Sequence, residues 1–250
     1  MKTTFLVLGL WLGGGVLNMA LAAEMTSASR FDVTIQSKVA QVTTKKEFRN
    51  VQGYVEDGIV TLTGNVDLYQ QKLDATKKIR KLANVQGVRN LIAVNGNVSD
   101  AQLTAALDRK LYYDRLAQDN VFNYVTASAE NGVITLSGET RNEFDRDSAL
   151  WLVDNTAGVK DVIDNIRVAP VSIFDDRIRI SALRAIYRDP VLSRYAIDPA
   201  KPIRIVVDRG HLSLYGTVAS NLDKQVAGIR AAQVFGAFTV QNNLQVEKKS

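Results

Sequence analysis

Three short stretches of alternating hydrophobic and polar residues, each bounded by glycines, recur along the chain. They occupy residues 57–64, 131–138 and 209–216 and read DGIVTLTG, NGVITLSG and RGHLSLYG. Apolar side chains at every second residue predict a strand with one buried face and one largely wet face. The Asp-Gly or Asn-Gly step is typical of a two-residue hairpin turn. Each stretch therefore predicts a β-hairpin, with first strands at residues 52–56, 124–129 and 203–208.

A second glycine follows each hairpin, 23 residues after Gly64 and 20 residues after Gly138 and Gly216. The intervening residues predict a helix, because apolar side chains recur at helical spacing. Leu222, Val226 and Ile229 form one such apolar stripe, and Phe144, Ser148, Trp151 and Leu152 form another. The first copy has three more residues in this interval, so we expect its helix to be about one turn longer.

Each copy is completed by a third strand and by an opening helix. The third strands are expected at residues 88–94, 162–168 and 238–246, and the opening helices at residues 33–42, 101–117 and 175–187. The predicted fold class is α+β, as three tandem small α-β-β-α-β modules, each a three-stranded mixed sheet packed on two helices. The expected modules are 31–98, 99–170 and 171–250, the third being divergent. The expected structural turn glycines are Gly58, Gly64, Gly87, Gly132, Gly138, Gly158, Gly210, Gly216 and Gly236.

Residues 1–22 have the features of a signal peptide. Lys2 precedes an apolar stretch that ends in the small residues Ala20-Leu21-Ala22, and this is the pattern of a cleavage site. An uncleaved membrane anchor is the alternative. The chain has no cysteine, so it can carry neither a disulfide nor a lipobox cysteine. We therefore expect an exported periplasmic protein that is soluble after cleavage and is not a lipoprotein.

The repeat resembles the BON domain family, as found in OsmY-like periplasmic proteins. The resemblance rests on the glycine-bounded strands and on the segments GVRNLI at residues 87–92 and GVKDVI at residues 158–163. It covers essentially the whole mature chain, although the third copy has Ala237-Phe238 after its second glycine and Arg209 before its hairpin glycine. The resemblance implies an envelope protein without catalytic motifs, for which binding to anionic phospholipid has been proposed.

Charge is distributed unevenly among the three copies. The chain has a formal net charge of +5, but the copies carry about +4, −5 and +5 in order. Basic surfaces attract anionic lipid by about 1 kcal/mol per Lys or Arg near the headgroups. The candidate lipid-binding residues are Lys77, Lys78, Arg80 and Lys81, of which Lys77, Lys78 and Lys81 are expected to share a helical face, and Arg177, Arg184 and Arg188 on the third opening helix. Alternatively, these residues have a structural role, because positive charges near a helix C-terminus interact favourably with the helix dipole.

A further mixed cluster lies in the second copy. Arg109, Lys110, Tyr112 and Tyr113 combine charge with aromatic side chains, which suits a membrane interface. The net negative charge of that copy weighs against this interpretation.

The residue inventory argues against catalysis and against a bound cofactor or metal. The chain has a single histidine, His211, which is expected on the wet face of a hairpin. Paired carboxylates such as Asp145 with Asp147 and Asp175 with Asp176 lie at helix starts, where acidic residues favour the dipole. No basic run alternates with stacking aromatics, so nucleic acid is not an expected partner.

We therefore expect a non-enzymatic envelope protein. The leading hypothesis is binding to anionic phospholipid or envelope surfaces, in support of envelope integrity under osmotic or other stress. The alternative is a periplasmic protein-interaction or chaperone-like module that acts, or self-associates, through its oppositely charged repeats. A hydrolase is the least supported hypothesis.

Overall fold

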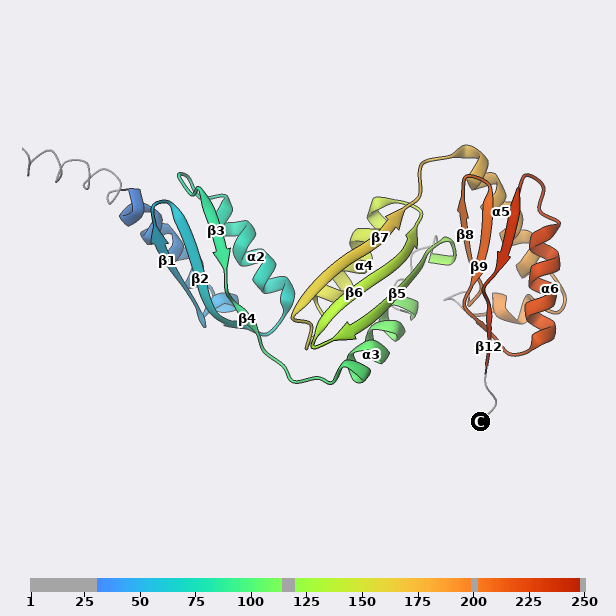
Figure 1. Cartoon of the computed structure of the whole chain (residues 1–250), viewed down its shortest axis with the longest axis horizontal. Helices are drawn as coiled ribbons and strands as arrows, with labels where there is room; N and C mark the ends of the chain where they lie inside the picture. The colour runs from blue at the N-terminus through green and yellow to red at the C-terminus, as the bar shows by residue number, and fades with distance from the viewer. Residues whose placement is uncertain (1–30, 114–119, 199–201, 248–250) are drawn as a thin grey trace, which may run out of the picture. The chain divides into compact units, whose positions relative to one another are not determined.

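The computed structural model describes residues 31–113, 120–198 and 202–247. Within these ranges the chain forms three successive α/β modules (Figure 1). The α+β fold class and the mixed pairing of the sheets are confirmed. The sheet of module 2 has the expected three strands, whereas in module 1 a fourth short strand also pairs with the second, and in module 3 a separate two-stranded pair accompanies the three-stranded sheet. The predicted signal peptide at residues 1–22 lies outside the described residues, as do residues 114–117 of the second opening helix.

The three modules repeat the same order of elements. Module 1 has helical residues 31–43, a 3-10 helix (Lys46–Phe48), β1 (Val51–Glu56), β2 (Ile59–Val66), α2 (Tyr69–Arg80), β3 (Gly87–Asn90) and β4 (Ala93–Val94). Module 2 has α3 (Asp100–Tyr113), η2 (Asn120–Phe122), β5 (Tyr124–Glu130), β6 (Val133–Thr140), α4 (Glu143–Asp154) and β7 (Asp161–Val168). Module 3 has α5 (Ile173–Tyr187), η3 (Ser193–Ala196), β8 (Arg204–Asp208), β9 (His211–Tyr215), β10 (Thr217–Val218), α6 (Asn221–Ala232), β11 (Thr239–Asn242) and β12 (Gln245–Val246).

In every module the hairpin strands pair antiparallel and the third strand pairs parallel to the second. The sheet orders are β1-β2-β3, β5-β6-β7 and β8-β9-β11, so the second strand is central. A tight turn can only join antiparallel neighbours, whereas the helix between the second and third strands allows a parallel crossover. The two-residue turn between the hairpin strands is left-handed at both central positions, for example at Asp57 and Gly58.

The first copy aligns differently from our expectation. Asn84, with φ of 68°, occupies the left-handed position that Gly158 and Gly236 occupy in modules 2 and 3, whereas Gly87 begins β3 and has no positive φ. The interval from Gly64 is then equal in all modules, and α2, α4 and α6 each have 12 residues. The prediction of a longer first helix was therefore wrong, because asparagine replaces glycine at the turn.

The third strand is interrupted in modules 1 and 3, where we expected one continuous strand. Asn90 Oδ1 accepts a hydrogen bond from Ile92 N (3.0 Å), and Asn242 Oδ1 accepts one from Leu244 N (3.3 Å). The equivalent Asp164 of module 2 accepts the same hydrogen bond from Ile166 N (2.9 Å) although β7 is continuous, so this contact is shared by all three modules and does not by itself break the strand. The residues that follow the break, Ile92 and Leu244, are buried in the core.

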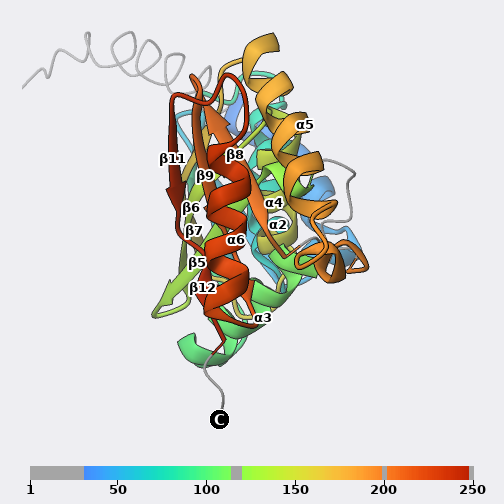
Figure 2. The ribbon, with the colours of Figure 1, turned by 90° about the vertical axis from the view of Figure 1, so that its right-hand side faces the viewer.

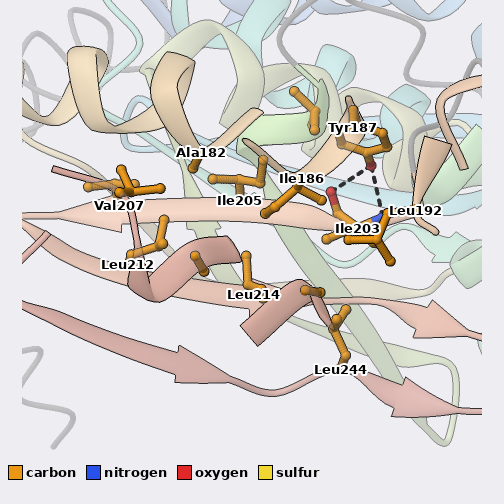
Figure 3. Packing of buried hydrophobic residues seen from close by; sticks show 14 of the residues in the cluster. Ala182, Ile186, Tyr187, Leu192, Ile203, Ile205, Val207, Leu212, Leu214 and Leu244 are labelled. Atoms are coloured by element: carbon orange, nitrogen blue, oxygen red, sulfur yellow. Dashed lines mark hydrogen bonds between the residues drawn. The ribbon is translucent and has the colours of Figure 1, made fainter. Parts of the chain in front are cut away.

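The core of each module lies between the sheet and its helices. In module 3, α5 and α6 lie on one side of the sheet (Figure 2). Figure 3 shows their buried side chains meeting those of β8 and β9, and the Tyr187 hydroxyl donating to Ile203 O (2.8 Å) while it accepts from Ile203 N (3.0 Å). The packing helices contribute small residues such as Ala182, Ala227 and Ala231, which allow a close approach.

The apolar stripes predicted on α4 and α6 are divided between core and surface, since Leu152 is buried and Val226 packs against the core. Phe144, Trp151, Leu222 and Ile229 are all exposed, whereas Ala149 and Ala227 are buried. The apolar residues on the inner faces are Ala149, Leu152 and Val153 on α4 and Ala227 and Ala231 on α6. The outward aromatic and aliphatic side chains are available for contacts with other molecules.

The outer faces of the sheets in modules 2 and 3 are partly buried, which corrects the expectation of a wet face. Tyr124 and Tyr215 stack with ring centroids 4.2 Å apart. Arg204, only 3 % exposed, donates to Asn120 O (2.7 Å) and Tyr112 O (3.1 Å). Modules 2 and 3 therefore share an interface built on their outer sheet faces.

The chain divides into two compact units. One consists of residues Met1–Val66 and Gln71–Ala93, and the other of Asp67–Gln70 and Val94–Ser250. Modules 2 and 3 thus belong to one unit. Across the described ranges, no helix has both the length and the apolar character that crossing a bilayer requires.

Candidate functional site

Three phenylalanines are exposed together at one end of module 3. Phe174 lies in the first turn of α5, and Phe235 and Phe238 lie in the connection between α6 and β11. Their exposed fractions are 75 %, 97 % and 79 %. Isolated exposed apolar residues are ordinary, but a cluster of aromatic rings at a single end of a domain marks a contact surface.

A buried carboxylate fixes the start of the helix that carries Phe174 to the hairpin turn. Asp175, next to Phe174, accepts hydrogen bonds from Arg209 N (3.0 Å) and Gly210 N (2.8 Å) in the turn between β8 and β9. The same contact joins Asp32 to the turn of module 1 and Asp100 to that of module 2. The start of each opening helix is thereby fixed to its hairpin, so that side chains from both elements lie at one end.

Phe238 lies against the same turn. Its backbone N donates to Gly210 O (2.8 Å), and a Cβ on Gly210 would come within 2.6 Å of the Phe238 ring. Gly210 has φ of 79°, a backbone conformation that favours glycine. Because glycine has no side chain, the Phe238 ring can also approach the turn closely.

Arginines surround the phenylalanines. A depression of about 990 Å³ lies between the rings. Its lining includes the side chains of Phe174, Arg177, Arg184, Arg209, Phe235 and Phe238, which we name the aromatic–arginine surface. Arg177 and Arg184 are exposed and form no ion pair within the described part of the chain.

The nearby carboxylates are already engaged. Asp175 is 2 % exposed and bonded to the hairpin turn. Burial alone would raise the pKa of Asp176, but hydrogen bonds and charge from Arg179 and Arg141 outweigh it and hold that pKa below its ordinary value. Asp176 therefore stays ionised and paired. Arg209 lies 3.8 Å from Asp208, so the free charge at this end belongs to Arg177 and Arg184.

The equivalent ends of the other modules lack this combination. The positions of Phe174, Phe235 and Phe238 are filled in module 2 by Ser99, Ala157 and Lys160, and in module 1 by Phe31, Ala83 and Gln86. The aromatic–arginine surface therefore belongs to module 3 and not to the shared fold.

The predicted lipid-binding residues are separated by the structure. Arg177 and Arg184 line the aromatic–arginine surface, whereas Arg188 is exposed at the C-cap of α5 and does not. The lysine-rich set lies at the end of α2 in the other unit.

Lys77, Lys78 and Lys81 do not form the common helical face that we expected. Lys78 donates to Glu47 Oε1 (2.7 Å), lies 4.8 Å above the Phe48 ring and is half-buried. The hydrogen bond from Lys78 lowers the pKa of Glu47. Lys77, Arg80 and Lys81 are exposed, and Lys81 follows the end of the helix.

Tyr112, which belongs to the mixed cluster predicted in the second copy, has a structural role. The Arg204 guanidinium lies 4.7 Å from the Tyr112 ring, and burial raises the pKa of Tyr112 to about 12. Tyr112 thus contributes to the interface of modules 2 and 3, while Tyr113 is exposed.

The aromatic residues of the site were missed by the sequence-based prediction, although a sign of them was present. Phe238 and Arg209 are the positions at which the third copy departs from the repeat. A residue that breaks a structural pattern without serving the core is a candidate for function.

No metal site is indicated in the described ranges, where no group of three or more His, Cys, Asp or Glu side chains could hold an ion. His211 is exposed, and its Nδ1 lies 2.6 Å from Thr239 Oγ1.

Solved structures with a distant likeness come from secretion systems. Two are structures of CdsD, a structural protein of the type III secretion system of Chlamydia trachomatis. The first is 12 % identical and covers 87 % of this chain and 93 % of its own (TM-score 0.25), and the second, of the C-terminal domain, is 13 % identical and covers 84 % and 96 % (TM-score 0.25). The third is the periplasmic domain of the inner-membrane protein PrgH from S. typhimurium, 12 % identical, covering 83 % and 98 % (TM-score 0.19). These TM-scores are too low to support an argument about fold or function.

Family membership is clear by contrast. No curated protein matches the chain. The family model described as BON domain matches residues 31–96, 99–170 and 188–248. These three segments cover most of the chain, and one falls within each module of the structure. The chain therefore belongs to the BON domain family, of which it contains three copies.

Proposed function

We propose that this protein is exported to the periplasm and binds anionic phospholipid surfaces through the aromatic–arginine surface of module 3. It does so without catalysis and supports envelope integrity under osmotic or other stress. BON domains occur in periplasmic and envelope proteins and are generally non-enzymatic. The observation that carries the proposal is the cluster of three exposed phenylalanines beside Arg177 and Arg184, which have no ion pair in the described ranges.

The two residue types suit the two layers of a membrane surface. Phenylalanine rings can leave water for the boundary of the acyl chains, each contributing about 1.5–3 kcal/mol when fully buried. Arginine binds phosphate oxygens with its planar donors, and each cation adds about 1 kcal/mol near an anionic leaflet. The surface carries both, and the net charge of about +5 on module 3 attracts the same lipids from a distance.

Vesicle flotation tests the proposal. The exported chain should float with vesicles that contain phosphatidylglycerol and remain behind with pure phosphatidylcholine. Phe174→Ser combined with Phe235→Ser should weaken binding at least about tenfold, because two exposed rings no longer enter the bilayer. Arg177→Glu combined with Arg184→Glu should abolish the preference for anionic vesicles.

Ile197→Ser is the matched control, since Ile197 is an exposed apolar residue of module 3 that does not line the depression. It should float like the parent chain. Failure of the parent chain to float at low salt would remove lipid binding from the proposed function, and equal flotation of all variants would remove this surface.

The cations of α2 remain a second proposed lipid contact. Lys77→Glu combined with Lys81→Glu tests them in the same assay. If these changes remove flotation while the phenylalanine variant retains it, the site of lipid contact lies on module 1.

A protein-interaction role is the second candidate function. It is favoured by the outward aromatic residues of α4, Phe144 and Trp151, which lie outside the aromatic–arginine surface.

A further inference from the structure

The second helix of each module presents one outward stripe, whose residues are three and four positions apart. In α2 it consists of Leu73, Lys77 and Arg80, continued by Lys81. In α4 it consists of Phe144, Asp147 and Trp151, with Glu143 beside it, and in α6 of Leu222, Gln225 and Ile229. Leu73 and Lys77 occupy the same helix positions as Asp147 and Trp151 of α4 and as Gln225 and Ile229 of α6, whereas Arg80 corresponds to the last residue of those helices. The stripes differ in charge: the α2 stripe is cationic, the α4 stripe is anionic and aromatic, and the α6 stripe is neutral.

The α4 stripe is unusually apolar for a free helix surface. Phe144 and Trp151 are 75 % and 64 % exposed. Asp147, between them, is exposed and forms no ion pair within the described residues. Arg146, which precedes Asp147 in the helix, is already bonded to Glu143 (2.9 Å) and Asp164 (2.7 Å). The stripe therefore offers two aromatic rings and an uncompensated negative charge.

The α2 stripe is its complement. Leu73 is 38 % exposed, and Lys77 and Arg80 are exposed and without an ion pair in the described part of the chain, in contrast to Lys78, which binds Glu47. Lysine and arginine are attracted both to carboxylates and to the face of an indole ring. Pairs of like stripes repel each other and the α6 stripe is neutral, so the pairing that gains from charge is α4 with α2.

We propose that two copies of this protein associate through the α4 stripe of one copy and the α2 stripe of the other. Such a contact joins different surfaces of identical chains, so a third and further copies can add in the same way. The partner is thus a second copy of this chain, recognised by charge complementarity around Phe144, Trp151 and Leu73. The contact requires no lipid and is independent of the aromatic–arginine surface.

Sedimentation velocity in the absence of lipid tests the proposal. The exported chain should form concentration-dependent oligomers at about 0.02 M salt and dissociate at about 0.5 M, where charges are screened. Lys77→Glu or Asp147→Lys alone should raise the dissociation constant at least about tenfold. The two single variants should associate with each other when mixed, because the unchanged α4 stripe of the Lys77→Glu variant meets the unchanged α2 stripe of the Asp147→Lys variant. The double variant, in which residues 77 and 147 exchange their charges, should associate more tightly than either single variant.

As controls, charge changes of the same kind are made at positions outside the stripes. Arg89→Glu on β3 and Glu130→Lys at the turn of module 2 are exposed positions and should leave association unchanged. Trp151 supplies an independent measurement, because the only other tryptophan, Trp11, lies in the predicted signal peptide. Its emission should shift to shorter wavelength as the protein concentration rises at low salt. A strict monomer at low salt, a shift that is independent of concentration, or failure of the double variant to recover would each overturn the proposal.

Discussion

Asp154 is a buried carboxylate without a compensating cation in the described part of the chain. It lies at the end of α4, is 8 % exposed, and burial raises its pKa to about 6. A negative charge at a helix C-terminus is also opposed by the helix dipole. The equivalent residues of modules 1 and 3 are Arg80 and Ala232, so the fold does not require an acid there.

This carboxyl predicts a pH-dependent stability. Its pKa is higher in the folded chain than in the unfolded chain, where Asp has its ordinary value of about 4. Its contribution is therefore most favourable below pH 4 and is lost as the pH rises through 6. Asp154→Asn should raise the free energy of unfolding by about 1–3 kcal/mol at pH 8 and have little effect at pH 4. Urea unfolding at both pH values measures this, and a gain of equal size at pH 4 and pH 8 would contradict it.

At the scale of elements, the contact between the opening helix and the hairpin is the repeated feature. In module 2, Asp100 accepts hydrogen bonds from Asn131 N (2.8 Å) and Gly132 N (2.9 Å). A charged acceptor suits these donors because the turn points both of its backbone N–H groups outward. The contact explains why each opening helix begins with an acidic residue, beyond the dipole effect that we expected from the sequence.

Removal of this acceptor should destabilise the module. Asp100→Ala leaves two backbone donors without their partner, so we expect a loss of about 2–4 kcal/mol in the free energy of unfolding. Glu130→Ala is the matched control, since Glu130 is exposed at the end of β5 and has no such contact. Chemical unfolding of both variants provides the measurement. An equal effect of the two substitutions would show that the contact has no special role.

At the scale of the whole molecule, modules 2 and 3 are joined more closely than a tandem repeat requires. Val121 and Phe122 of η2 belong to the hydrophobic core of module 3. Arg204 of β8 donates across the same junction to Asn120 and Tyr112. Shared core residues and a buried arginine predict that these two modules unfold together.

Arg204→Ala should uncouple them. The parent chain should show one thermal transition for residues 94–247 and another for the first unit. The variant loses two charged hydrogen bonds and the contact with the Tyr112 ring, about 3 kcal/mol together, so modules 2 and 3 should then melt separately. Calorimetry distinguishes the cases, with Arg188→Ala as an exposed arginine control. A single unchanged transition in the Arg204 variant would show that the junction does not depend on this residue.

Local patterns were sufficient to predict the repeated fold. Alternation around the Asp-Gly and Asn-Gly turns determined the hairpins, because turn geometry and strand period depend on neighbouring residues. Helix orientation could not be derived in the same way. Phe144 and Trp151 have helical spacing, yet the side chains that α4 buries include the smaller Ala149 and Val153. The spacing of apolar residues predicts a helix, but which of its apolar residues are buried depends on how the helix packs against the sheet.

The amino-acid sequence by itself determined the class of fold, the threefold repeat and the unequal charges of the copies, since these follow from short-range patterns and composition. Only the tertiary structure decided which charged and aromatic residues meet. It brought Phe174 from one helix together with Phe235 and Phe238 from a distant turn, paired Lys78 with Glu47, and buried Arg204 between two modules. Contacts between residues far apart in the chain depend on how elements pack, and no local pattern contains that information.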